Sequence, residues 1–255
     1  MSEREEVLLE PAFVLHHRPY RNTSQLLECL TGGHGRTALI AKGSYRRERR
    51  QRAQRAILQA FVPLRLSWIR RGEIGRLTAV EADGPQLQFG GERLLAAFYV
   101  NELALRLLAR GDSNEEAFVC YCHCINALAE AASVARTLRL FELSFLQTLG
   151  YGLQLDHDAV TGEPIQPDTR YVYSVESGPS AAGDAVPEAV YWGRELISLR
   201  GGSLDDPESL RAAKRLLSTV LRNYLGERPL KTRAVFEDIA ARGRFAGRAG
   251  KAGPR

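Results

Sequence analysis

The chain has 255 residues, of which 44% are hydrophobic and 25% are charged. These proportions are near the globular average, which excludes wholesale disorder, and the length fits one or two domains that need no disulfide or metal to hold a core. No apolar run approaches the roughly 18–20 residues of a membrane span, and the acidic N-terminus lacks the basic start of a signal peptide. We therefore expect a soluble, cytoplasmic protein.

The positive charge is concentrated in two segments. The formal net charge is +5, yet residues 42–55 carry +6 and residues 241–255 carry another +5, so the rest of the chain is net acidic. A basic segment of this kind permits binding to nucleic acid without requiring it. The last residues, 243–255, have Gly-Ala spacing and are expected to form a disordered basic tail.

The first 83 residues are typical of a small β-barrel. Short apolar runs at 12–15, 26–30, 37–41, 61–69 and 74–80 are separated by Gly-rich and polar turns. Five strands in about eighty residues favour a five-stranded OB-fold, which would make residues 1–83 a DNA-binding domain. Strand counting alone leaves an SH3-like barrel or a fragment of a β-sandwich open.

Past residue 83 the hydrophobic period becomes helical, so the chain is expected to be α+β. Helices are predicted at about 94–108, 112–132, 133–149, 192–199, 207–225 and 229–242, which places a helical domain at 84–242. Residues 156–190 interrupt this pattern with an acidic loop, in which 171–175 are expected to form a short hairpin.

The basic segment between the third and fourth predicted strands is the candidate DNA-binding element. It lies in a loop or a short helix, where guanidinium groups can pair with phosphate oxygens. Exposed aromatic rings beside such cations can stack on bases, and Tyr20 and Tyr45 are the loop aromatics nearest to the cations. The alternative is a solvated helix face. The full candidate set is Arg18, Lys42, Tyr45, Arg46, Arg47, Arg49, Arg50, Arg52, Arg55, Arg70 and Arg71.

No motif in the chain indicates catalysis. Cys120 and Cys124 share one helical face while Cys122 points away, so the three thiols cannot converge on one zinc ion without unwinding the helix. We expect them to act as small buried hydrophobic residues. The glycines at 32–35 lack the Lys-Ser/Thr of a phosphate loop, and His16-His17 lacks further ligands at metal spacing.

Five motifs in chain order resemble the RecO family of bacterial recombination mediators. The opening at residues 12–24 and the segment 36–43, followed by the basic run, are similar to the start of that family. Residues 99–103 resemble its Y-x-N-E-L motif. Residues 138–143 with 149–152, and residues 210–215 with 224–233, are similar to its central and C-terminal helices. The resemblance covers about residues 11–240.

The resemblance implies an N-terminal OB-fold, a C-terminal helical domain and no enzymatic activity. It implies binding to single- and double-stranded DNA, annealing of complementary strands, displacement of single-strand-binding protein (SSB), and cooperation with RecR in loading RecA on gapped DNA near the nucleoid. Many members carry a four-cysteine zinc site after the Leu-Gly-Tyr stop. Here Asp158 and Thr161 stand where the first cysteine pair would be, and no cysteine occurs at 171–190, so we expect no zinc and no other cofactor.

Two further sites follow from the resemblance. The SSB C-terminal tail, a short acidic peptide ending in Phe, needs an apolar pocket with a basic rim, for which Arg139, Leu138 and Phe141 are the candidates. A second DNA surface is expected at the helical cations Arg211, Lys214, Arg215, Lys231 and Arg233. The alternatives are an OB-fold RNA-binding or translation-associated protein, and a metal-dependent enzyme using Cys120, His123 and Cys124.

Overall fold

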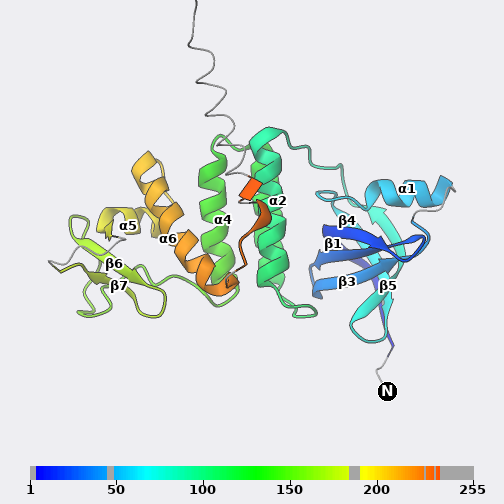
Figure 1. Ribbon diagram of the computed structural model, residues 1–255, viewed down its shortest axis with the longest axis horizontal. Coiled ribbons are helices and arrows are strands. Elements are labelled where there is room, and N and C mark those ends of the chain that lie inside the picture. Colours follow the sequence, from blue (N-terminus) through cyan, green and yellow to red (C-terminus); the bar gives the residue numbers. More distant parts are fainter. Residues whose placement is uncertain (1–3, 45–48, 184–189, 227, 233, 236–255) are drawn as a thin grey trace, which may run out of the picture. The chain divides into compact units, whose positions relative to one another are not determined.

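The computed structural model describes residues 4–44, 49–183, 190–226, 228–232 and 234–235, without the side chains of residues 50 and 51. Strands predominate up to residue 82 and helices after it, which confirms the predicted α+β class (Figure 1). Among the described residues, no helix is long and apolar enough to cross a membrane.

The N-terminal strands close into a barrel. Its neighbour order is β1-β2-β3-β5-β4, and β4 pairs with β1 to close it. Strands β3 and β5 run parallel, while β4 is antiparallel to both β5 and β1. This confirms the five-stranded OB-fold. The strands are β1 (Glu5–Tyr20), β2 (Ser24–Thr31), β3 (Gly35–Ala41), β4 (Leu64–Arg70) and β5 (Ile74–Ala82), and α1 (Arg49–Ile57) lies between β3 and β4.

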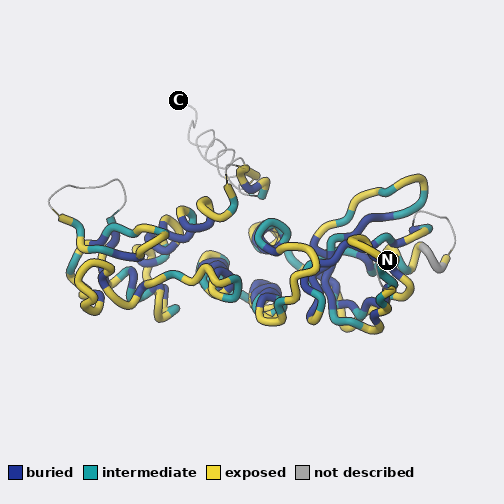
Figure 2. Tube along the Cα trace, turned by 90° about the horizontal axis from the view of Figure 1, so that it is seen from below, coloured by how far each residue is buried: buried dark blue, intermediate teal, exposed yellow. Residues whose placement is uncertain are grey.

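Alternating apolar positions fill the barrel. Leu64, Leu66 and Trp68 of β4 are buried with Leu27 of β2 and Leu39 of β3 in one hydrophobic cluster. Because successive side chains of a strand point to opposite faces, this period-2 pattern directs one face inward. Figure 2 shows the same contrast, with dark blue along the strands near the N-terminus and yellow at their connecting loops.

Helix α2 (Gly91–Leu107) packs with the barrel. One compact unit draws its described residues from Met1–Leu30, Arg36–Gly111 and Leu225–Arg255. Asn101 of α2 donates from Nδ2 to the buried carbonyl of Leu15 at 3.0 Å. The Phe61 ring packs edge-on against the rings of Phe89 and Phe98, with ring centres 5.1 Å apart in both pairs. These contacts hold α2 and the segment before it against the barrel. The chain changes from strands to helices after residue 83, and both sides of this change belong to the same compact unit.

The segment after α6 (Pro207–Leu225) is also held by α2. Glu102 accepts hydrogen bonds from the backbone N–H groups of Lys231 (2.8 Å) and Thr232 (2.9 Å). Arg106 donates to the carbonyls of Leu225, Arg228 and Pro229. The glutamate of the Y-x-N-E-L motif is thus an N-terminal cap for the short helical turn beginning at Lys231. The rest of the helix expected at 229–242, and the tail at 243–255, lie outside the described residues.

The second unit comprises Thr31–Gly35 and Asp112–Tyr224. Asn114 and Ser133 cap its first two helices by accepting from Ala117 N and Arg136 N, as Asn and Ser commonly do at helix N-termini. The hairpin expected at 171–175 is present, and a third strand, at the junction between the predicted acidic loop and the helix predicted from residue 192, completes a sheet of order β7-β6-β8. The elements are α3 (Glu115–Glu130), α4 (Val134–Thr148), β6 (Arg170–Ser174), β7 (Gly178–Ala181), β8 (Val190–Trp192), α5 (Gly193–Gly201) and α6 (Pro207–Leu225).

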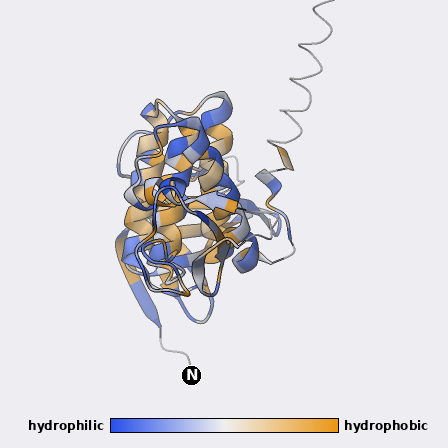
Figure 3. Cartoon of the chain, turned by 90° about the vertical axis from the view of Figure 1, so that its left-hand side faces the viewer, coloured by the Kyte–Doolittle hydropathy of each residue, from blue (hydrophilic) through white to orange (hydrophobic). Residues whose placement is uncertain are grey.

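The helices of this unit are amphipathic. In α6, Ala213, Leu217 and Leu221 are buried along one face, at the spacing of a 3.6-residue period. Figure 3 shows hydrophobic and hydrophilic stretches side by side on the same helices. Packing of these apolar faces, more than helix propensity, stabilises the unit.

Candidate nucleic-acid interface

Helix α1 presents the described part of the basic segment. Arg49, Arg52 and Arg55 are exposed on it, and Lys42 is exposed in the turn after β3. No acidic residue occurs within the helix. Tyr45, Arg46 and Arg47 lie outside the described residues, as does the side chain of Arg50, so the structure places four of the seven cations of residues 42–55.

The end of α1 is fixed to the barrel by apolar contacts. Leu58 is completely buried in the barrel cluster, and Ile57 packs against the same cluster. The backbone N–H of Leu58 donates to the Gln54 carbonyl at 3.1 Å, which continues the helical turn into the core. The C-terminal end of the basic helix is therefore anchored to the barrel core. Its exposed cations lie on the barrel surface.

The other barrel candidates differ in how far their charge is compensated. Arg18 and Arg71 are exposed. Arg70 lies opposite Glu5 in the β1–β4 register and donates from Nε at 2.7 Å to its carboxylate. Tyr20 is half-buried, with the Arg21 guanidinium 5.4 Å from its ring centre. Arg70 is thus engaged within the barrel, whereas Arg18 and Arg71 present their charge to solvent.

The proposed second DNA surface is divided between the two units. Arg211, Lys214 and Arg215 are exposed on α6, and Arg222, which the sequence analysis did not select, continues the same side of that helix. Lys231 belongs to the barrel unit, and Arg233 lies outside the described residues. Arg211, Arg215 and Arg222 are at positions i, i+4 and i+11, which lie on one face of a helix. This spacing is the sequence signal that could have identified Arg222.

Arg139 does not present its charge to solvent. It is only 9% exposed, and its Nη2 donates to the carboxylate of Glu142 one turn along α4. Leu138 and Phe141 are buried beside it. Of the three residues expected to bind the SSB tail, Phe141 lines a groove between α3 and α4, whereas Arg139 is held in a buried ion pair.

The α3–α4 groove has a volume of about 670 Å³. Its walls are partly apolar and its polar groups include both signs of charge. The lining residues are Glu115, Glu116, Val119, Cys120, His123, Cys124, Ala127, Arg136, Thr137, Leu140, Phe141 and Ser144.

Burial keeps the three thiols of α3 protonated, and two of them, Cys120 and Cys124, line this groove. Burial raises the pKa of Cys120 and of Cys122 to about 11, and it raises that of Cys124 well above its ordinary value. Nearly all of each thiol is therefore protonated near pH 7, and only a thiolate is a good nucleophile or metal ligand. Among the described residues, no group of three or more His, Cys, Asp or Glu side chains is placed to hold a metal ion.

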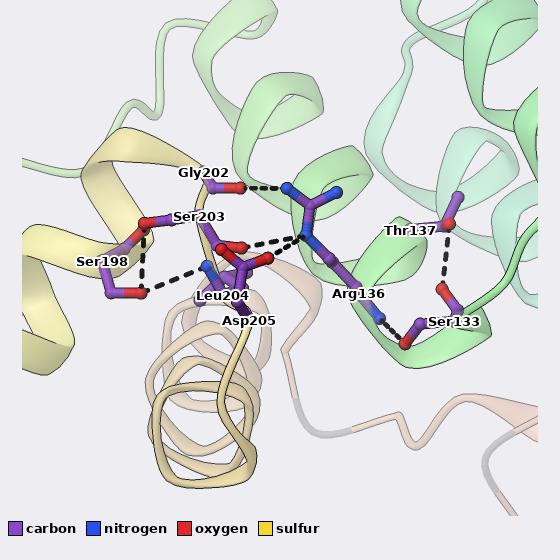
Figure 4. Close-up of polar contacts among 8 residues, drawn as sticks. All are labelled: Ser133, Arg136, Thr137, Ser198, Gly202, Ser203, Leu204 and Asp205. Carbon is purple, nitrogen blue, oxygen red and sulfur yellow. Dashed lines mark hydrogen bonds and ion pairs between the residues drawn. The ribbon is translucent and has the colours of Figure 1, made fainter.

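Arg136 in the groove wall links α4 to the α5–α6 connection. It donates from Nη2 to the Gly202 carbonyl at 2.7 Å and from Nε to the Ser203 carbonyl at 3.0 Å, and Asp205 lies 3.7 Å away (Figure 4). Gly202 takes a left-handed conformation where α5 ends. Arg136 therefore satisfies carbonyl groups left over at the end of a helix. The sequence analysis did not select it.

Asp158 organises the loop for which the sequence analysis predicts no zinc site. Its buried carboxylate accepts from the backbone N–H groups of Val160 (2.8 Å), Thr161 (3.1 Å) and Ala181 (2.8 Å). Desolvation alone would raise its pKa, but these bonds together hold the pKa of Asp158 below its ordinary value. One carboxylate thus joins the loop to β7.

A closed five-stranded barrel carrying a cationic helix, followed by a helical unit, defines a class of barrel-based nucleic-acid-binding protein. Comparisons with known proteins narrow this class. The family model "Recombination protein O N terminal" matches residues 6–85, and "Recombination protein O C terminal" matches residues 88–234. The chain belongs to the RecO family of DNA repair proteins.

Similar proteins cover nearly the whole chain. "DNA repair protein RecO" of Nitrosococcus oceani is 45% identical over 235 residues, which span 91% of this chain and 94% of that protein. The proteins of the same name from Methylococcus capsulatus and Azoarcus sp. are 43% and 37% identical, over 90% and 94% of this chain and 93% and 99% of their own lengths. This membership supports a role in DNA repair and recombination over the RNA-binding alternative.

Proposed function

We propose that the protein is a non-enzymatic recombination mediator. It binds single- and double-stranded DNA, anneals complementary strands, displaces SSB and, with RecR, promotes RecA loading on gapped DNA. The observation that carries this proposal is the exposed set Lys42, Arg49, Arg52 and Arg55 on a helix seated on an OB-fold barrel. Cations in this position can hold a strand by its phosphates and leave its bases available for pairing.

Annealing needs a second strand to approach the first against phosphate repulsion. The exposed cations Arg211, Lys214 and Arg215 of α6 supply a second basic surface on the other unit. Because phosphate contacts carry no sequence information, two such surfaces can concentrate any pair of strands. Base pairing then selects the complementary pair.

SSB capture is assigned to the α3–α4 groove. Its volume of about 670 Å³ suits a short peptide, and Phe141 supplies part of an apolar wall for a terminal aromatic ring. Capture of the terminal carboxylate by Arg139 requires opening of the Arg139–Glu142 pair. Arg139→Ala should abolish tail-peptide binding and retain DNA binding; full retention of peptide binding would exclude this residue.

We further propose that the protein functions without zinc. The support is that Asp158 already cross-links the loop through three backbone hydrogen bonds. Elemental analysis of purified protein should find no stoichiometric zinc. One zinc ion per chain would overturn this part of the proposal.

The test of the function as a whole is strand annealing on SSB-coated DNA. Two complementary oligonucleotides, each saturated with SSB, should anneal rapidly when the protein is added and without added nucleotide. If the protein accelerates annealing of bare strands but not of SSB-coated strands, the proposed DNA binding and annealing are supported and the proposed SSB displacement is refuted. No acceleration in either case would refute the proposal.

A further inference from the structure

Trp192, the last residue of β8, is exposed and has an arginine against its ring. Its side chain is 38% exposed, and the Arg194 guanidinium carbon lies 4.8 Å from its ring centre. Arg170 of β6 is the cross-strand partner of Trp192 and is also exposed. Directly paired residues project from the same face of a sheet, so Arg170 adds a second cation to the face that carries the indole.

The turn that carries Trp192 is rigid. The backbone N–H of Gly193 donates to the Thr169 carbonyl at 2.8 Å, and that of Arg194 to the Pro167 carbonyl at 3.0 Å. The backbone approaches so closely here that a Cβ on Gly193 would lie 1.9 Å from the Gln166 carbonyl oxygen. The backbone that carries the indole is therefore held in place before any ligand arrives, which lowers the entropy cost of binding.

The residues around Trp192 also lie next to the cationic side of α6. Arg194 and Arg211 line one hollow of about 580 Å³. The Arg215 guanidinium lies 5.3 Å from the Tyr191 ring centre, and its Nη2 donates to the Val190 carbonyl at 3.4 Å, so α6 contacts β8.

Acidic groups are also present around Trp192, and most of them are engaged. Asp168 lies 3.8 Å from Arg194. Glu195 accepts from the backbone N–H of Trp192, and Asp206 accepts from the first N–H groups of α6. Glu208 lines the hollow as well. This mixed charge favours a ligand that offers an aromatic surface as well as phosphates over one bound by charge alone.

We propose that Trp192 is a stacking platform for an unpaired base of single-stranded DNA, with Arg170, Arg194 and Arg211 on the adjoining phosphates. The inference deepens the proposed function, on which it rests, by making the second DNA surface selective for single strands. Every base has a π-face, so stacking tolerates any sequence, whereas the bases of a duplex are already stacked on one another. A strand held here presents its other bases for pairing.

The chain provides an internal reporter for this contact. It has two tryptophans, and Trp68 is completely buried in the barrel. Titration of the full-length protein with an oligo-dT strand should quench emission from Trp192, and the quenching should vanish in Trp192→Phe. An abasic strand of the same length, which offers phosphates without bases, and a duplex should bind with little quenching.

Affinity measurements complete the test. Trp192→Ala should weaken oligo-dT binding about tenfold, Trp192→Phe should restore part of the loss, and duplex binding should be unchanged. Val160→Ala, a truncation at an 82%-exposed position of the same unit, is the matched control and should bind as the wild type. If oligo-dT binds without quenching Trp192 and with equal affinity for Trp192→Ala, the platform is refuted while the proposed function stands. If no strand binds, both are refuted.

Discussion

Reversing the charge of α1 tests the central element of the proposed function. The triple variant Arg49→Glu, Arg52→Glu and Arg55→Glu removes the three described cations of this helix. All three are exposed, and the helix is anchored through Ile57 and Leu58, so the barrel core is untouched. Melting followed by circular dichroism should confirm that the variant is folded.

The expected magnitude follows from counterion release. Each phosphate neutralised on a single strand contributes roughly 0.7 to the slope of log affinity against log salt, so three contacts contribute about 2. Between 50 and 200 mM salt, a fourfold change, those contacts account for about twentyfold of the affinity that the wild type loses. The variant should bind weakly at low salt and lose affinity less steeply as salt rises.

Fluorescence anisotropy of a labelled oligo-dT strand at several salt concentrations measures both quantities. The matched control replaces the same three arginines by lysine, which keeps the charge and should keep the slope within about 0.5. A glutamate variant whose slope equals that of the wild type would refute the assignment of α1 as a phosphate-binding element.

Three predictions concern the structure that positions these surfaces. Asn101→Ala leaves a buried β1 carbonyl without its donor and should lower the free energy of unfolding by about 1–3 kcal/mol in urea titrations; no change would show that α2 docks without this bond. Asp158→Ala should lower the melting temperature above about pH 4, with the difference shrinking in more acidic buffer, because the stabilisation from a lowered pKa is lost as the wild-type carboxylate protonates; a pH-independent difference would contradict this. Gly193→Ala places a methyl group 1.9 Å from the Gln166 carbonyl oxygen and should cost more than about 2 kcal/mol, whereas Gly152→Ala, whose Cβ meets nothing closer than 3.7 Å, should cost far less; equal melting temperatures would refute the close approach.

Local patterns predicted the elements well because they depend on near neighbours in the chain. Strand β4 alternates through Leu64, Leu66 and Trp68, and that period is sufficient to place it. Asn114 and Ser133 mark helix starts because their side chains satisfy N–H groups only three residues away. Strand β8 escaped prediction because three residues are too few to show a period, and pairing with β6 alone makes them a strand.

The sequence predicted that the site is cationic, but it did not predict which individual cations are exposed. A run of arginines without acids indicated a cationic surface, and the exposed Arg49, Arg52 and Arg55 agree with that composition. Arg139 has the same charge, yet its pairing with Glu142 buries it. Arg70 likewise meets Glu5 only because β1 and β4 are neighbours, 65 residues apart in sequence. Sequence reports which charges exist; their partners are set by contacts between distant segments.

The sequence by itself determined the order of the barrel strands and of the main helices, the cationic segment and the family resemblance, since these rest on periodicity, composition and motifs read along the chain. Only the tertiary structure decided that α2 packs with the barrel through Asn101, that Glu102 and Arg106 hold the returning chain, and that Trp192 stands exposed beside α6. The physical reason is that burial and hydrogen-bond partners depend on which surfaces meet, and packing between residues far apart in the chain brings those surfaces together.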